Sequence, residues 1–188
     1  MLLLCLPLPQ VRGNLNDGRT RRLIEVFGAP IHFHSKPVRG TLRGTALKRR
    51  RTILLYEAGE PLRFDAQAIE IGVAGVLRVM RSLGMWEGEI PPPPEPRFHA
   101  ASTRWLRAPR SGIFHLGVSL GETVTRRQVL GRIADPFSRE SSAVRAPVDG
   151  LVIGFTNNPL VYQGGALIHL ARQVTPAPAA LPLHPPLS

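Results

Sequence analysis

The chain contains the motif APRSGI at residues 108–113 and a second copy of it, APVDGL, at residues 146–151. A longer stretch, VTRRQVLGRIA at 124–134, is likewise repeated as VYQGGALIHLA at 161–171. Neither copy has a helical period, and one copy alone is too small to bury its own apolar face. The repeat therefore predicts an all-β domain with an internal two-fold relation, in which glycines supply the bends.

The hairpin between the two copies excludes one related function. The repeat resembles the barrel-sandwich hybrid of biotinyl and lipoyl carrier domains, which carry a lysine on the hairpin before the second AP-x-x-G motif. The corresponding hairpin here, DPFSRESSAV at 135–144, contains no lysine. Without an amine there is no group to form the amide with biotin or lipoate, so the resemblance supports the fold and not an acyl-carrier function.

The segment before the repeat alternates helical and strand patterns. Asp17 is placed to cap a helix that Gly28 ends, and a second short helix is expected over 41–50. The run TILLY at 52–56 is apolar and β-rich, which is typical of a strand covered on both faces. A third helix begins after Asp65 and is expected to bury one stripe, formed by Ile69, Val73, Val76, Leu77, Met80 and Leu83. This alternation predicts an α/β layer with too few strands for a complete sheet.

Proline-rich stretches divide the chain. IPPPPEPR at 90–97 has no continuous row of backbone donors and is expected to form an extended linker. We therefore expect an α/β domain at 1–89, this linker, a β-domain at 98–172 and a disordered, Pro- and Ala-rich tail at 173–188. The apolar start, MLLLCLPLP at 1–9, lacks the features of an export signal and is too short to span a bilayer. It is interpreted as a buried strand or as the remnant of a longer chain.

The net charge of +11 comes almost entirely from arginine, since only Lys36 and Lys48 are lysines. The basic runs at 19–22 and 48–51 fall where helical turns are expected, and they lack the interleaved aromatic residues of a nucleic-acid surface. They are interpreted as solvated helix faces, so neither nucleic acid nor a membrane is expected as a partner. The single cysteine, Cys5, permits no internal disulfide and fits a reducing compartment, which predicts a cytoplasmic location.

Two side chains are candidates for chemistry. Glu57 follows the TILLY strand, and ligands of an open α/β sheet gather beyond the carboxyl ends of its strands. A carboxylate there is suited to act as a general base on water, and the alternative is a structural ion pair with one of the many arginines. Arg43 lies among small residues in GTLRGTA at 40–46, which leaves room for an anionic ligand, and the alternative is a plain surface arginine. His32 and His34 have no third ligand at useful spacing, so no metal site is predicted.

The most specific pattern is spread from about Pro9 to Ala171. It consists of PQVRGNLNDGRTRRLIEVFGAP, SKPVRGTLRGTALKRRRTILLYEAGEPLRFD, SLGMWEG, TRWLRAPRSGIFHLGVSLGETVTRRQVLGRIADP and APVDGLVIGFTNNPLVYQGGALIHLA. These stretches resemble the succinylglutamate desuccinylase and aspartoacylase family. The resemblance implies a zinc-dependent amidohydrolase that removes N-acyl groups from amino acids or related amines. It also implies a fold with a carboxypeptidase-like α/β domain, present here only in part, followed by a barrel-sandwich-like β-domain.

The same resemblance assigns roles to three residues. It places Glu57 on the general base of the family, Arg43 on an arginine that holds a substrate carboxylate or acyl carbonyl, and Tyr162 on a tyrosine that reaches into the pocket from the β-domain. The family holds its zinc with a His-x-x-Glu pair and with a histidine in an Asp-Leu-His turn, and neither motif occurs in this sequence. The resemblance thus implies zinc as the cofactor but predicts no metal ligand in this chain.

We therefore interpret the chain as the carboxyl-terminal part of a zinc-dependent deacylase, a hydrolase of linear amides. Its substrate would be a small N-acyl amino acid or amine, and its partner would be the missing N-terminal half or a second copy of itself. Without zinc ligands the chain alone is expected to be inactive. The alternative is a non-catalytic binding or assembly module that acts through its β-domain, because an uncovered sheet edge or apolar face needs a partner.

Overall fold

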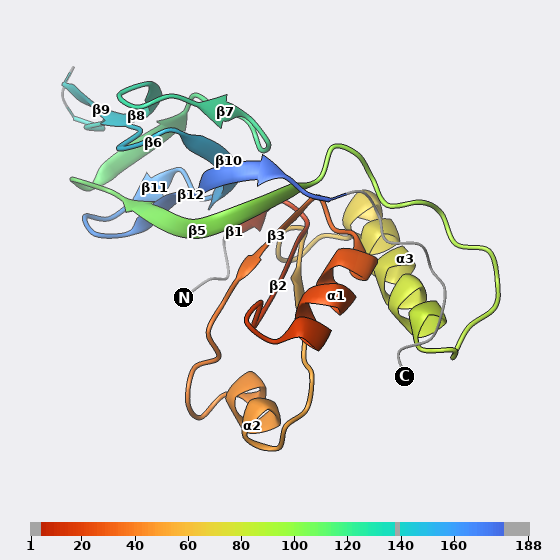
Figure 1. The fold of residues 1–188 in the computed structure, drawn as a ribbon. Coiled ribbons are helices and arrows are strands. Elements are labelled where there is room, and N and C mark those ends of the chain that lie inside the picture. The colour runs from red at the N-terminus through yellow and green to blue at the C-terminus, as the bar shows by residue number, and fades with distance from the viewer. Residues whose placement is uncertain (1–4, 138–139, 179–188) are drawn as a thin grey trace. The chain divides into compact units, whose positions relative to one another are not determined.

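The computed structural model describes residues 5–137 and 140–178, which form twelve strands and three helices (Figure 1). The chain is divided into two compact units. We call residues 1–8, 59–63 and 101–174 the β unit, and residues 9–58, 64–100 and 175–188 the mixed unit. The division at the linker 90–97 stays a prediction. None of the helices in the described part is both long and apolar enough to cross a bilayer.

The β unit contains strands of two sheets. One sheet has the order β1 (Cys5–Pro7), β10 (Gly150–Thr156), β12 (Ala166–Pro176) and β5 (Phe98–Arg107), with β7 (Thr123–Val124) also paired to β10. The other has the order β11 (Leu160–Val161), β6 (Gly112–Leu116), β8 (Val129–Ala134) and β9 (Ser141–Arg145). Fully buried aliphatic side chains form the core, among them Val124, Leu130, Ile133, Val152, Leu167 and Ile168. As predicted, the described residues from Phe98 to Pro176 form strands and no helix.

The fifth residue of each copy of the repeated motif is a glycine that begins a strand. Gly112 begins β6 and Gly150 begins β10. A β-carbon at Gly112 would lie 2.4 Å from the carbonyl oxygen of Ala134, and one at Gly150 would lie 2.4 Å from that of Ala171. Any side chain at either position would therefore collide with the backbone of the neighbouring strand, which explains why both copies carry glycine there.

The two ends of the chain depart from their predictions. β12 continues to Pro176, so the predicted disorder is wrong for residues 173–176. The next two residues, Ala177 and Pro178, form hydrogen bonds with Arg97. The N–H of Ala177 donates to the carbonyl of Arg97 at 2.8 Å, and Nη2 of Arg97 donates to the carbonyl of Pro178 at 2.8 Å. The rest of the tail lies outside the described residues. At the other end, β1 is half-buried and not buried as predicted, and residues 1–4 lie outside the described part.

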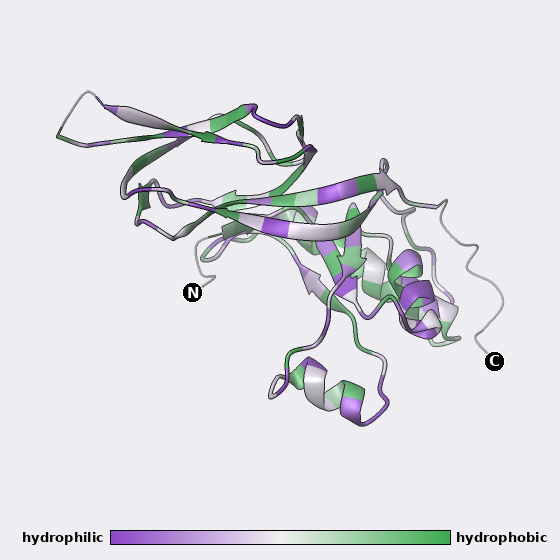
Figure 2. Cartoon of the chain, turned by 60° about the vertical axis from the view of Figure 1, so that its left-hand side comes forward, coloured by the Kyte–Doolittle hydropathy of each residue, from purple (hydrophilic) through white to green (hydrophobic). Residues whose placement is uncertain are grey.

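Strand β2 (Gln10–Gly13) is the central strand of the mixed unit. It pairs in parallel with β3 (Ile31–His34) and antiparallel with β4 (Leu55–Glu57), and β3 pairs in parallel with the start of β5. Helix α1 (Gly18–Phe27) begins and ends as predicted, because the Asp17 carboxylate accepts from the Thr20 N–H at 2.7 Å and Gly28 adopts a left-handed conformation. The predicted second helix is α2 (Leu42–Lys48), which stands apart from the sheet of this unit (Figures 1 and 2).

The strand predicted at 52–56 was placed incorrectly. β4 spans only Leu55–Glu57, and all three residues are half-buried. It is the last strand in the order β3, β2, β4, so among the described residues it has a neighbouring strand on one side only. Helices α1 and α3 (Ala66–Ser82) contact one of its faces. On that face the Tyr56 ring packs against Phe27 at a centroid distance of 5.2 Å, and its hydroxyl donates to the carbonyl of Ala68 at 2.7 Å. The apolar run was predicted to be covered on both faces, but the strand is shorter, begins three residues later and is only half-buried.

Helix α3 (Ala66–Ser82) exists as predicted, but the face predicted to be buried was wrong. Ile69, Val73 and Val76 are each at least half exposed. The buried residues are mostly small, namely Ala68, Ile71, Ala74, Gly75, Arg78 and Ser82. A β-carbon at Gly75 would lie 2.4 Å from the Phe27 ring, so the glycine lets that ring approach the helix backbone. The buried face of α3 is therefore the one whose small residues let aromatic rings approach the helix backbone, and it is not determined by hydrophobicity alone.

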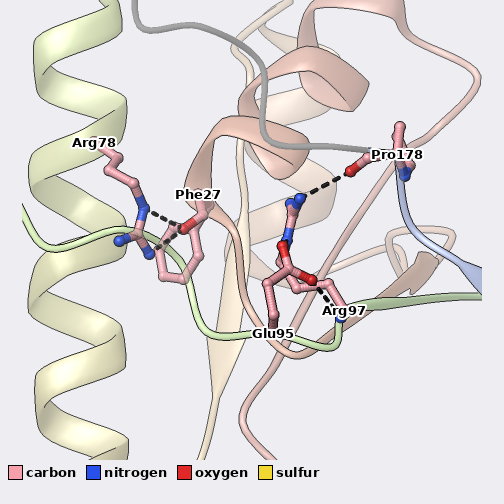
Figure 3. Close-up of polar contacts among 5 residues, drawn as sticks. All are labelled: Phe27, Arg78, Glu95, Arg97 and Pro178. Atoms are coloured by element: carbon pink, nitrogen blue, oxygen red, sulfur yellow. Dashed lines mark hydrogen bonds and ion pairs between the residues drawn. The ribbon is translucent and has the colours of Figure 1, made fainter.

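A buried arginine joins α3 to the end of α1 (Figure 3). Arg78 is 3% exposed, and its Nε and Nη2 donate to the carbonyl of Phe27 at 3.0 and 2.7 Å. Its Nη1 donates to the carbonyl of Pro91 at 2.8 Å. Phe27 is the last residue of α1, where carbonyl groups lack partners within the helix and the helix dipole favours a positive charge. Arg78 therefore fixes α1, α3 and the start of the proline-rich linker to one another.

Replacing Arg78 by lysine is expected to lower the free energy of unfolding by about 2 kcal/mol, because one ammonium group cannot reproduce three hydrogen bonds to two carbonyls. Urea unfolding followed by circular dichroism measures the change. The matched control is Arg19→Lys on exposed α1 surface, which should change stability by less than about 0.5 kcal/mol. Equal stabilities of the two variants would contradict the role of Arg78.

A buried histidine, His32, is expected to make the mixed unit sensitive to acid. His32 on β3 is 6% exposed, and its ring lies 5.2 Å from that of His99. Burial, which is the largest cause, and the nearby His99 and Arg97 together lower the pKa of His32 to about 4. His32 is therefore neutral in the folded protein at neutral pH. The unfolded chain binds a proton at this residue below about pH 6.5, whereas the folded chain binds it only near pH 4.

Stability is thus expected to fall as the pH is lowered from about 6.5 to about 4, with His32 contributing up to roughly 3 kcal/mol of the loss. His32→Gln should remove most of this contribution, which urea unfolding at a series of pH values would measure. His115→Gln, at an exposed position, serves as control and should keep the wild-type slope. A wild-type slope in His32→Gln would show that other groups cause the acid sensitivity.

Candidate functional site

Alternate residues of β2 and β4 form one face of the sheet in the mixed unit. Gln10 pairs with Glu57, and Arg12 pairs with Leu55. Side chains of directly opposed residues point to the same face, so these residues share the face opposite to Val11 and Tyr56. Since Tyr56 contacts the helices, Gln10, Arg12 and Glu57 lie on the side of the sheet away from α1 and α3.

The carboxylate of Glu57 is held at both of its oxygens. Nη2 of Arg12 forms an ion pair with Oε1, and Nε2 of Gln10 donates to Oε2 at 3.1 Å. The side chain of Glu57 is 35% exposed and that of Arg12 is 24% exposed, whereas Gln10 is buried. Glu57 is therefore fixed in orientation but remains accessible. Of the two interpretations of Glu57, the structure displays the ion pair with an arginine.

The position of Glu57 differs from the one that the sequence predicted. Glu57 is the last residue of β4 and does not follow the strand. Because β4 runs antiparallel to β2, Glu57 lies beside Gln10, the first residue of β2. It is therefore at the amino end of the parallel strands, and the rule that ligands gather at carboxyl ends does not explain its place. The rule failed because the direction of β4 was not visible in the sequence.

Arg43 projects from α2 to the end of β3. Its Nη2 donates to the carbonyl of Ser35 at 2.7 Å and its Nη1 to the Ser35 hydroxyl at 3.2 Å. The N–H of Ser35 in turn donates to the carbonyl of Gly13, the residue after Arg12, at 2.9 Å. Burial lowers the pKa of the Arg43 guanidinium, the positive charge of Arg12 lowers it further, and the carboxylate of Glu57 raises it. Arg12, Arg43 and Glu57 are thus within electrostatic reach of one another.

One of the small residues around Arg43, Gly44, has a structural role in α2. A β-carbon at Gly44 would lie 2.4 Å from the carbonyl oxygen of Val38, so this glycine permits close approach of two backbone segments. The Thr41 hydroxyl oxygen caps α2 by accepting from the Gly44 N–H at 3.1 Å. Gly44 therefore fixes the first turn of α2, from which Arg43 projects.

Gly44→Ala should displace the first turn of α2 and lower stability by about 1 kcal/mol or more, because the new methyl group meets the Val38 carbonyl and not a flexible side chain. Thermal unfolding measures this change. Gly18→Ala, in the first turn of α1, has no heavy atom within 4 Å of the added carbon and should be neutral or slightly stabilising. A neutral Gly44→Ala would show that the approach of Val38 is not required.

Gln10, Arg12 and Arg43 each have a buried polar atom without a partner in the described part of the chain. Among the described residues, the buried side-chain nitrogens and oxygens that lack a hydrogen-bond partner are Oε1 of Gln10, Nε of Arg12 and Nε of Arg43. Leaving a buried donor or acceptor unpaired costs about 1–3 kcal/mol. Such a cost is unusual in a purely structural cluster and common at sites that bind a ligand. Gln10 and Arg12 were not among the predicted site residues, although their alternation in PQVRG places them on one face of a strand.

Tyr162, the third predicted site residue, belongs to the β unit. It follows β11, its side chain is exposed, and its carbonyl accepts from the N–H of Gly165 at 2.8 Å. Glu57 and Arg43 belong to the mixed unit. The role of Tyr162 beside them therefore stays a prediction.

The described residues do not fit a zinc site. They contain no group of three or more His, Cys, Asp and Glu side chains close enough to hold a metal ion. His34 accepts from the Leu15 N–H through Nδ1 at 3.2 Å, and His32 faces His99. The zinc that the resemblance implies thus has no ligand set in this part of the chain.

Comparison with known proteins identifies the fold. No protein-family model matches the chain, and no curated protein is a match. Among solved structures, the ectoine utilization protein EutE (DoeB) from Ruegeria pomeroyi matches with a TM-score of 0.82 and 17% identity, over 90% of this chain and 56% of that one. A succinylglutamate desuccinylase/aspartoacylase from Rhodobacter sphaeroides matches with a TM-score of 0.78 and 21% identity, over 94% and 56%. An aspartoacylase family protein from Mesorhizobium loti matches with a TM-score of 0.70 and 19% identity, over 90% and 59%.

The chain thus has the fold of succinylglutamate desuccinylase/aspartoacylase family proteins, and it spans about half the length of the solved structures that it matches. The resemblance predicted from the sequence is confirmed at the level of the fold. At identities of 17–21%, the shared feature is the fold and not a shared substrate.

Proposed function

We propose that the chain is the carboxyl-terminal part of an amidohydrolase that removes an N-acyl group from an amino acid or related amine. The observation that carries the proposal is the group formed by Glu57, Arg12 and Arg43 in a fold shared with desuccinylases and aspartoacylases. A fixed, accessible carboxylate next to two guanidinium groups suits the hydrolysis of an amide that bears an anionic end.

The residues of this chain would share the work as follows. Glu57 takes a proton from the water that attacks the amide carbon, and it gives the proton to the nitrogen when the C–N bond breaks. Arg43 binds the anionic end of the substrate and so orients the scissile bond. Zinc would have to be held by residues outside the described part of the chain. The chain alone is therefore expected to be inactive, with its partner a metal-binding half of the same architecture, in the cytoplasm.

The finer architecture supports this assignment. We propose that the mixed unit is an incomplete α/β layer and that the repeat forms a two-fold pair within the β unit. The parallel pairs β2–β3 and β3–β5 support the layer. Reciprocal pairing supports the two-fold relation, since β6 pairs with β11 and β10 pairs with β7.

A second candidate function is a non-catalytic binding or assembly module that acts through its β-domain. Exposed large side chains of the β unit favour it, because Phe137 is almost fully exposed and Leu160 and Tyr162 are at least half exposed. Self-association of the metal-free chain in light scattering would support the module, whereas a monomer that neither binds zinc nor self-associates would argue against it.

The purified chain is expected to hold no stoichiometric zinc and to hydrolyse neither N-acetylaspartate nor N-succinylglutamate. Metal analysis and a ninhydrin assay of released amine check this. Zinc at one equivalent together with hydrolysis would contradict the inactivity of the isolated chain.

The catalytic assignment is tested on a longer protein, if the DNA upstream of Met1 encodes an in-frame His-x-x-Glu and Asp-Leu-His. Glu57→Gln in that protein should lower kcat at least 100-fold, because the substituted amide cannot accept the proton. Glu87→Gln, an exposed residue, is the matched control and should keep wild-type activity. Full activity in Glu57→Gln would exclude the proposed general base.

A further inference from the structure

The charges around Glu57 do not balance. Arg12 and Arg43 contribute two positive charges, and Glu57 contributes one negative charge. Both oxygens of the carboxylate are already engaged, by Arg12 and by Gln10, whereas Arg43 binds only the carbonyl and hydroxyl of Ser35. One positive charge therefore remains without a counter-ion within this group of residues.

The unpartnered atoms belong to the same residues. Nε of Arg12 and Nε of Arg43 are buried donors without a partner among the described residues, and Oε1 of Gln10 is a buried acceptor in the same condition. A structural ion pair between Arg12 and Glu57 would require neither a second guanidinium nor orphaned donors beside it. Excess positive charge and unpaired donors both favour the arrival of an anion.

We propose that Arg12 is a specificity-determining residue of this site, which keeps one positive charge in excess beside Glu57 and so selects ligands that carry a carboxylate over their neutral analogues. The positive charge of Arg12 neutralises the carboxylate of Glu57, so that the charge of Arg43 remains available to a ligand. Without Arg12, Glu57 and Arg43 would neutralise each other and the site would lose its preference for an anion. Gln10 contributes by holding the second oxygen of Glu57, which keeps that carboxylate on Arg12.

The inference rests on the proposed function for the identity of the site, but it concerns binding and needs no metal or turnover. It makes opposite predictions for the two partners of one ion pair. Removing the charge of Arg12 should weaken carboxylate binding, whereas removing the charge of Glu57 should strengthen it. A purely structural ion pair would lose stability from either change and would not reverse the sign of an effect on binding.

The test compares N-acetylglycine with N-acetylglycinamide, its neutral analogue, by NMR titration of the isolated chain at low ionic strength. The wild-type chain should prefer the carboxylate by about tenfold or more. Arg12→Gln should bring the ratio of the two affinities close to about one, and Arg12→Lys should restore most of the preference. Glu57→Gln, which keeps the shape of the side chain, should raise the ratio above that of the wild type.

Arg39→Gln is the matched control, because it removes the same charge from an exposed position two residues before Thr41 and should leave the ratio unchanged. Equal affinities of the wild type for the two ligands would overturn the proposal, and so would a ratio that falls in Glu57→Gln. If Arg12→Gln does not fold, the direction in which Glu57→Gln changes the ratio of the two affinities still tests the proposal. Absence of hydrolysis in the longer protein would refute the deacylase assignment and leave these binding ratios standing, so the two failures are distinguishable.

Discussion

The pairing of β4 with β2 is the constraint on which the candidate site depends. These strands are far apart in sequence, and their antiparallel register sets Glu57 opposite Gln10 and Leu55 opposite Arg12. The period of two then places Gln10, Arg12 and Glu57 on one face and Val11 and Tyr56 on the other. A shift of the register by one residue would turn Glu57 toward the helices and expose Tyr56. The packing of Tyr56 on Phe27 and its hydrogen bond to Ala68 oppose that shift.

The local parts of the fold were predictable from the sequence. Asp17 and Gly28 are strong start and stop signals for α1, and the absence of a helical period after Phe98 correctly indicated strands. These features depend on a few neighbouring residues. The buried face of α3 was not predictable in this way, because it depends on where Phe27 and Tyr56 lie after folding. Hydrophobic periodicity predicted that Ile69, Val73 and Val76 are buried, whereas all three are exposed.

The candidate site, too, was predictable only in part from the sequence. Glu57 and Arg43 were candidates from the sequence and from the resemblance. Glu57 lies beside Gln10 at the amino end of β2, whereas Arg43 binds Ser35 after the end of β3, within electrostatic reach of Arg12 and Glu57. The direction of β4 decided where Glu57 lies, and direction is a property of the pairing and not of the residues in TILLY. Arg12 was hidden among many other arginines until its partner strand was known. A basic composition thus concealed the arginine that pairs with Glu57.

The two glycines that open β6 and β10 are also a marker of the architecture. Each occupies a position where the main chain of an adjacent strand leaves no volume for even a methyl group. This steric requirement does not depend on ligand, pH or partner, so it persists while the strands remain paired. In chains whose catalytic residues have all been replaced, a pair of glycines with this spacing would still indicate the same pairing of strands.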